Sequence, residues 1–134
     1  MPRLPLALLT AALIALFAPR VQADAPLTDR ERELMGIAAS CAAFYQAAMF
    51  ELDLPVEGNE DKRQAYLSVF NELAGRGRSA KELEAHYQRA VVQRFSEVAT
   101  LIQLDRTNVA PKVTANLPKC DAYLTEMKTA AGLE

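Results

Sequence analysis

Two cysteines, Cys41 and Cys120, constrain the fold of this chain more than any other feature of its sequence. In an oxidising compartment an even number of cysteines indicates pairing, and two cysteines allow only one bridge. That bridge would close a loop of about 80 residues. A reactive cysteine would instead need a neighbouring base, and nothing in the sequence places the single histidine, His86, beside either sulfur. We therefore expect a structural disulfide between Cys41 and Cys120 if the protein is exported.

The first residues have the composition of a secretory signal peptide. Arg3 supplies a positive charge, residues 4–18 form an apolar run, and small residues precede a cleavage point after Ala23. The run is shorter than the ~20 residues that a membrane-spanning helix needs, although a retained N-terminal anchor is the alternative. We expect residues 1–23 to be a cleaved signal peptide and residues 24–134 to form a single helical domain. The mature protein would then be periplasmic or secreted, with no stable membrane anchor.

The composition is that of an ordinary globular domain, with 51% hydrophobic and 24% charged residues. A length of 134 residues allows one domain. The formal net charge is −2, and cleavage would remove Arg3 and Arg20 but no acid. The mature chain is therefore mildly acidic, which argues against binding nucleic acid through bulk electrostatics.

Capping patterns predict where the first helices begin. Residues 28–31 read Thr-Asp-Arg-Glu, a capping box, and the helix that they start can continue to Leu54, before Pro55. A turn follows, with Asn59 as the expected N-cap of a second helix over residues 60–74. Gly75 is a natural residue to end that helix.

A second capping box, formed by Ser79 and Glu82, opens a long helix that is expected to reach Leu104. Its apolar residues fall within one sector at about 100° per residue, and they are Leu83, Tyr87, Val91, Phe95, Val98, Leu101 and Ile102. Arg94 projects from within that sector, between Leu101 and Tyr87. A guanidinium there must pair with an acid of another helix or extend to water. The functional alternative is an anchor for a ligand carboxylate or phosphate.

Residues 105–117 leave two possibilities open. Their polar residues and Pro111 favour a connection, followed by a last helix that begins at Pro118 and ends before Gly132. Against this, five residues recur at steps of three and four, namely Val113, Leu117, Cys120, Leu124 and Met127. That spacing predicts a helix from about residue 109, kinked at Pro118.

No segment alternates with period two over enough residues to predict a strand. The sequence therefore predicts an all-α fold, a small antiparallel bundle of three to four helices joined by short turns. One disulfide would staple the bundle. It would join the middle of the first helix to the start of the last.

The first predicted helix is apolar on two opposite sides. Opposite its main stripe lies a row of small residues that ends in an aromatic one: Gly36, Ala39, Ala43, Ala47 and Phe50. A helix that is apolar all round is usually central to a fold, with neighbours on every side. The other interpretation is a packing face for a partner protein or a second copy of the chain, with Phe50 as an apolar anchor. The row is therefore a candidate interaction surface.

Motifs of familiar enzymes and cofactor proteins are missing from the sequence. There is no C-x-x-C-H for haem, no C-x-x-C for thiol exchange, and no G-x-S-x-G, H-E-x-x-H, P-loop or Rossmann pattern. His86 falls on the polar side of the third predicted helix, so we expect a solvated residue rather than a catalyst or a haem ligand. We expect no catalytic residue, no metal site and no cofactor.

These features favour a non-catalytic interaction module outside the cytoplasm. Proteins of this kind include inhibitors, immunity-type protectors, assembly factors and small chaperones. The alternative is a carrier that holds a small apolar or anionic ligand in its helical core. An enzyme with an unrecognised site is the least favoured class.

Overall fold

Helices make up almost all of the computed structural model, which describes residues 26–133. The elements are α2 (Asp29–Phe50), α3 (Asn59–Gly75), α4 (Ala80–Tyr87), the π-helical turn η1 (Gln88–Val92), α5 (Gln93–Leu104) and α6 (Arg106–Ala131). Because α4, η1 and α5 form one continuous helix, the described part of the chain contains 4 helices and no strand. The predicted all-α bundle is confirmed. The predicted signal peptide, residues 1–23, lies outside the described residues.

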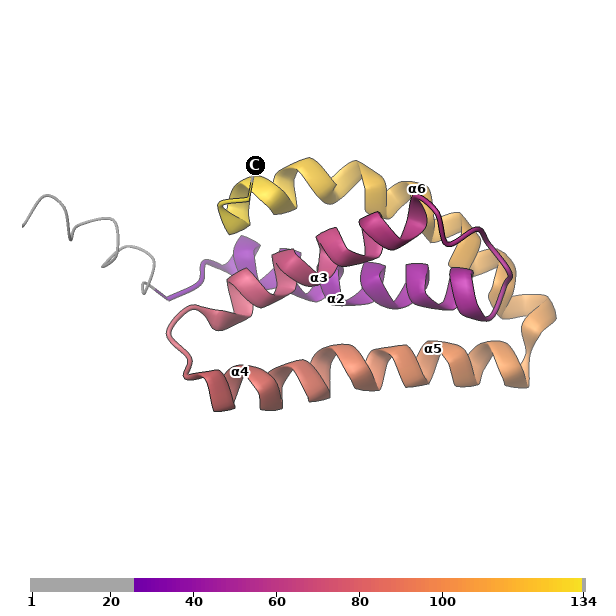
Figure 1. The fold of residues 1–134 in the computed structure, drawn as a ribbon, viewed down its shortest axis with the longest axis horizontal. Helices are drawn as coiled ribbons and strands as arrows, with labels where there is room; N and C mark the ends of the chain where they lie inside the picture. Colours follow the sequence, from indigo (N-terminus) through magenta and orange to yellow (C-terminus); the bar gives the residue numbers. More distant parts are fainter. Residues whose placement is uncertain (1–25, 134) are drawn as a thin grey trace, which may run out of the picture.

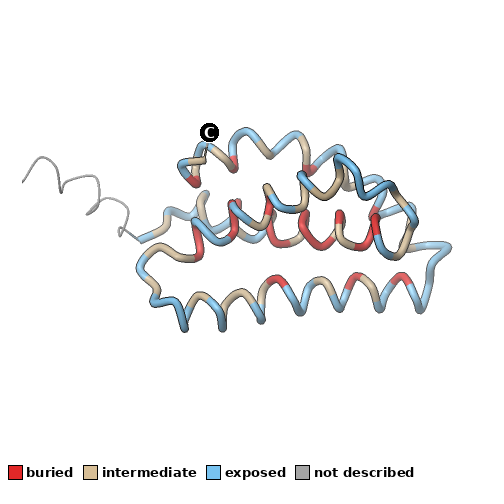
Figure 2. The backbone as a smooth tube through the Cα atoms, in the orientation of Figure 1, coloured by how far each residue is buried: buried red, intermediate tan, exposed pale blue. Residues whose placement is uncertain are grey.

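Helix α2 is the centre of the bundle. Successive helices run in opposite directions, and α2 lies between the long α4–α5 helix and α6 (Figure 1). It packs against α3, η1, α5 and α6. Buried residues are concentrated along it (Figure 2), as expected for a helix that is apolar on all sides.

The capping box that opens α2 is formed as predicted. The Thr28 hydroxyl accepts a hydrogen bond from the Glu31 backbone N–H at 3.1 Å, and the Thr28 N–H donates to Glu31 at 3.0 Å. The helix ends at Phe50, earlier than the predicted limit at Leu54. Asn59 is the first residue of α3 rather than its N-cap, which is Gly58 at φ 81°.

The long third helix contains a π-helical turn that the sequence analysis did not predict. The turn, η1, adds one residue to the helical repeat, so the residues after it are rotated by about 100° relative to a regular α-helix. Val98 and Ile102 remain buried, whereas Leu101 is 53% exposed. The expectation that Leu101 belongs to the apolar face is wrong, because that face was drawn with α-helical spacing throughout.

Helix α6 resolves the two possibilities for residues 105–117. The favoured connection is wrong, because a single residue, Asp105, separates α5 from α6. The helical spacing prevails, and both Pro111 and Pro118 lie exposed within α6, which is visibly curved (Figure 1). The helix ends at Ala131 and is capped by Gly132, whose φ of 73° is left-handed.

Helix α6 runs along the whole length of α2, not beside one half of it. At one end, the Arg106 guanidinium donates to the Glu51 carbonyl oxygen at 2.9 Å. At the other, Arg30 donates to both carboxylate oxygens of Glu126 at 2.8 and 2.6 Å. The disulfide therefore joins the middle of α2 to the middle of α6, not to its start.

Candidate functional site

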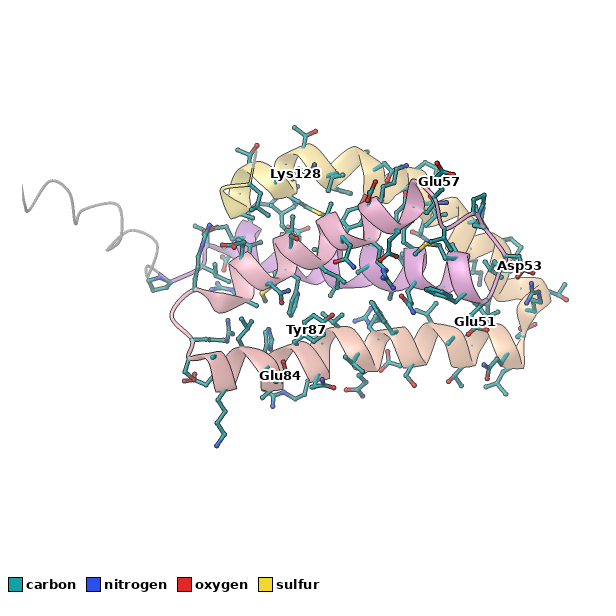
Figure 3. All side chains as sticks on the ribbon, viewed as in Figure 1. Glu51, Asp53, Glu57, Glu84, Tyr87 and Lys128 are labelled. Carbon is teal, nitrogen blue, oxygen red and sulfur yellow. A yellow bond between two sulfur atoms is a disulfide. The ribbon has the colours of Figure 1, made fainter. Side chains whose placement is uncertain are left out.

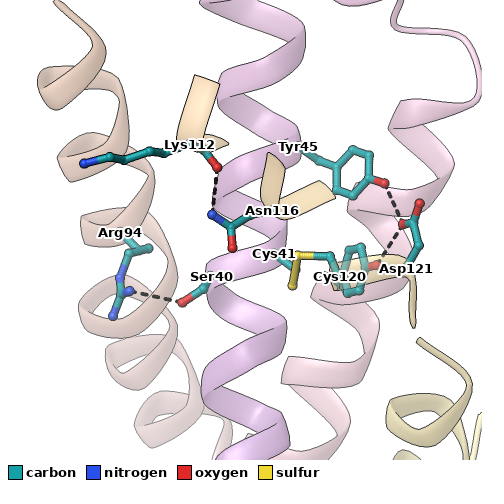
Figure 4. The surroundings of a disulfide bond; sticks show 9 residues. Ser40, Cys41, Tyr45, Arg94, Lys112, Asn116, Cys120 and Asp121 are labelled. Carbon is teal, nitrogen blue, oxygen red and sulfur yellow. Dashed lines mark hydrogen bonds between the residues drawn. A yellow bond between two sulfur atoms is a disulfide. The ribbon is translucent and has the colours of Figure 1, made fainter. Parts of the chain in front are cut away.

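The predicted disulfide is present. Cys41 of α2 and Cys120 of α6 are bonded, with their Cα atoms 5.7 Å apart (Figure 4). Both residues are almost completely buried, with exposed fractions of 2% and 3%. The bridge lies between two different features, a partly buried polar cluster and an open groove.

The polar cluster centres on Asp121, next to the bridge. Its Oδ1 accepts hydrogen bonds from the hydroxyls of Tyr45 at 2.5 Å (Figure 4) and Tyr66 at 3.1 Å, and its Oδ2 accepts from Lys62 at 2.9 Å. Burial raises the pKa of Asp121, but these hydrogen bonds outweigh it and hold the pKa below its usual range. Burial, together with Asp121, raises the pKa of both tyrosines. The cluster joins α2, α3 and α6.

This cluster was not predicted from the sequence, although one signal indicates it. Tyr45 lies one helical turn after Cys41, and Asp121 directly follows Cys120. A bridge between the cysteines therefore brings the tyrosine and the carboxylate together. Both tyrosines are almost completely buried, whereas the Asp121 side chain is 36% exposed, so the cluster ties two core hydroxyls to a carboxylate at the surface.

On the other side of the bridge, α2, α5 and α6 enclose an open hollow of about 450 Å³, here called the disulfide groove. Its floor is formed by Ile37, Phe44 and the disulfide, and its basic residues are Arg94 and Lys119. The remaining lining residues are Glu33, Gly36, Ser40, Asn116 and Tyr123.

Arg94 extends along the rim of the disulfide groove. Its guanidinium donates to the Ser40 hydroxyl oxygen at 3.0 Å (Figure 4). The nearest carboxylate is that of Glu97, on the same helix, at 3.7 Å, and the Arg94 side chain is 48% exposed. The head therefore extends to water, one of the two outcomes expected for a structural arginine. No acid of another helix pairs with it among the described residues.

The π-helical turn explains this position of Arg94. Regular spacing would place the side chain within the apolar face. The extra residue of η1 moves it to the edge of that face, beside α2 and α6.

The predicted row of small residues does not form one exposed surface. Ala39, Ala43 and Ala47 are at most 4% exposed, because other helices of the same chain cover them. Ala43 and Ala47 belong to a buried cluster with Val98, Ile102 and Val113 of α5 and α6. This part of the interaction-surface prediction is wrong. The two ends of the row, Gly36 and Phe50, are exposed.

Phe50 borders a second hollow, of about 300 Å³, here called the Phe50 groove. It lies between the end of α2 and the start of α5 and is lined by Gln46, Ala47, Phe50, Glu51, Val92, Phe95, Ser96 and Ala99. Phe50 is 57% exposed and Val92 is 40% exposed. Two large apolar side chains from different helices thus face water beside the same hollow.

His86 is not the solvated residue that the helical pattern predicted. Its ring stacks on Phe70 of α3 at 5.5 Å, and its Nε2 atom is buried with no hydrogen-bond partner among the described residues. Burial, and then the charges of Arg78 and Arg89, lower its pKa. Figure 3 shows the next residue, Tyr87, in the space between α4 and α3, where it meets Phe70 edge-on at 6.0 Å. His86 is therefore a packing residue whose charged form is disfavoured.

Among residues 26–133, no three acidic, histidine or cysteine side chains are grouped so that they could hold a metal ion. Within the same residues, no helix has the length and apolar character needed to cross a membrane. Comparisons with protein-family models, with curated proteins and with solved structures find no match.

Proposed function

We propose that this protein is a non-catalytic interaction module that works in the periplasm or outside the cell, and that it binds a partner protein through the Phe50 groove. The disulfide supports an oxidising environment. The observation that carries the proposal is the exposure of Phe50 and Val92 on both sides of one hollow.

Phe50 has the properties of an interface anchor. Burial of its exposed part by a partner would remove roughly 100 Å² of apolar surface from water and contribute about 2 to 3 kcal/mol. Aromatic residues beside small pockets often dominate the binding energy of an interface. Ala47 and Ala99 in the lining leave space for a partner's apolar side chain.

The charges around the Phe50 groove indicate which residues its partner presents. The Arg63 guanidinium lies 5.9 Å from the centre of the Phe50 ring, but it pairs with Glu60. Glu51 lines the groove itself, and only its backbone groups make hydrogen bonds among the described residues. A suitable partner segment therefore presents an apolar side chain with a basic or neutral polar residue beside it.

Site-specific photo-crosslinking in the native compartment tests this proposal. A photoreactive phenylalanine analogue at Val92 should form an adduct of one defined mass, whereas the same analogue at Leu104 should not. Leu104 is 78% exposed but lines no described hollow, so it controls for chance encounters.

The variant Phe50→Glu should abolish the adduct at Val92 while the far-ultraviolet circular dichroism remains unchanged. Equal adducts at Val92 and Leu104, or an adduct that persists in Phe50→Glu, would contradict the proposal. Absence of any adduct at Val92 would contradict it as well.

A further inference from the structure

The disulfide groove differs from the Phe50 groove in charge, and the two share no lining residue. Three charged side chains line it: Glu33, Arg94 and Lys119. Arg30 lies 2.9 Å from the Glu33 carboxylate but also binds Glu126, so it offsets the charge of Glu33 only in part, and the lining holds two cations against one acid. Arg94 has only the distant Glu97 at 3.7 Å, and no ion pair involves Lys119 among the described residues. The groove therefore carries net positive charge at its rim.

The floor of the groove is apolar. Ile37 and Phe44 are only partly buried, and the disulfide lies between them. Gly36 keeps one wall open, because a Cβ built on it would meet no atom within 4 Å. A volume of about 450 Å³ lies within the range of small-molecule sites.

Hydrogen-bond donors are also available at the rim. Arg94 uses one guanidinium nitrogen on the neutral hydroxyl of Ser40, which leaves other N–H groups for an anion. The Asn116 amide donates to the Lys112 carbonyl at 2.7 Å and has a second N–H. An anionic head can thus receive charge-assisted hydrogen bonds while its apolar body lies on Ile37 and Phe44.

We propose that the disulfide groove binds a small amphipathic carboxylate, a fatty acid of medium chain length, with its head at Arg94 and Lys119 and its chain along Ile37 and Phe44. The groove is open on one side, so the ligand exchanges with solvent. Charge complementarity selects this occupant over an uncharged lipid.

A titration of the oxidised ¹⁵N-labelled protein with decanoate, below its micelle-forming concentration, tests the proposal by NMR. Amide shifts should concentrate on residues that line the groove. Decanol should bind more weakly than decanoate, because it lacks the charge. Decyl phosphate in a parallel titration shows whether the site prefers a phosphate head, which would assign the site to phospholipid-like ligands and overturn the choice of a carboxylate.

Three variants sharpen the measurement. Arg94→Met keeps the apolar stem and should weaken the binding of decanoate at least about tenfold while leaving the binding of decanol unchanged. Arg89→Met removes an exposed cation of the same long helix, outside the groove, and should change the affinity for neither ligand. Gly36→Leu fills the groove and should abolish the binding of both ligands, whereas Ser68→Leu, at an exposed position of α3, should leave it intact.

Several results would overturn the proposal. One is the absence of amide shifts in the groove with millimolar decanoate. The others are decanoate binding that Arg94→Met and Arg89→Met weaken equally, and an Arg94→Met variant that loses as much affinity for decanol as for decanoate. A dimer that masks the groove, seen by native mass spectrometry, would assign the surface to a second copy of the chain instead. The Phe50 groove would be unaffected by any of these outcomes.

Discussion

Reduction of the disulfide should destabilise the protein by an amount that the loop length sets. The bridge joins residues 79 positions apart. In the chain-entropy model, a loop of this length lowers the entropy of the unfolded chain enough to stabilise the fold by about 4.5 kcal/mol at 25 °C. For a domain of this size, the same loss should lower the melting temperature by roughly 15 to 20 °C.

The native fold should survive reduction, because three other contacts join α2 to α6. They are the pair between Arg30 and Glu126, the hydrogen bond between Tyr45 and Asp121, and that between Arg106 and the Glu51 carbonyl. The double variant Cys41→Ala/Cys120→Ala should lose a further ~1 kcal/mol per site, because it also removes buried sulfur atoms.

Urea unfolding of the oxidised, reduced and double-variant proteins, followed by circular dichroism, measures these losses. The loop-entropy explanation requires most of the loss to appear already in the reduced wild type. A difference below about 1 kcal/mol between oxidised and reduced protein would refute it. So would a loss that appears only in the double variant, since that would trace the stabilisation to packing.

Three further predictions concern single residues. Gly36→Ala should stabilise the protein by about 0.5 to 1 kcal/mol in urea unfolding, because the added Cβ meets no atom and stiffens a helical position; a loss of stability would contradict this. Burial and two neighbouring arginines lower the pKa of His86 in the folded protein, so the unfolded chain binds more protons below the ordinary histidine pKa of about 6.5. The free energy of unfolding should therefore decrease as the pH falls from about 7 to 5, by at most about 1.4 kcal/mol per pH unit. Replacement of His86, the single histidine, by Phe should remove this slope. Asp121→Ala should cost about 2 to 6 kcal/mol by leaving two buried hydroxyls unpaired, and the added changes Tyr45→Phe and Tyr66→Phe should restore most of the loss in a mutant cycle.

Two helix caps and the disulfide were predicted correctly from the sequence, whereas the N-cap expected at Asn59 is at Gly58. The hydroxyl side chains of Thr28 and Ser79 cap the helices that they were expected to begin. The disulfide was predicted because two cysteines allow only one pairing. The start of α6 was predicted less well, because Pro111 and Pro118 each remove a backbone donor and argue against a helix. The packing of Val113, Cys120 and Met127 against the core outweighs that cost.

The candidate sites depend on features that a helical wheel does not contain. No residue in η1 marks a π-helical turn, yet that turn places Arg94 at the disulfide groove instead of in the core. The burial of Ala43 and Ala47 depends on α5 and α6, whose positions follow from the whole bundle. Phe50 was a candidate anchor from the sequence and is exposed in the structure, but the hollow beside it comes from η1 and α5.

Binding of a partner protein at the Phe50 groove can be tested by the native mass of the oxidised protein in an extract of its own compartment. We expect a complex heavier than the monomer for the wild type and for Leu104→Glu, and a free monomer for Phe50→Glu. If all three proteins run as monomers, or if Phe50→Glu retains the complex, the Phe50 groove is not the binding surface.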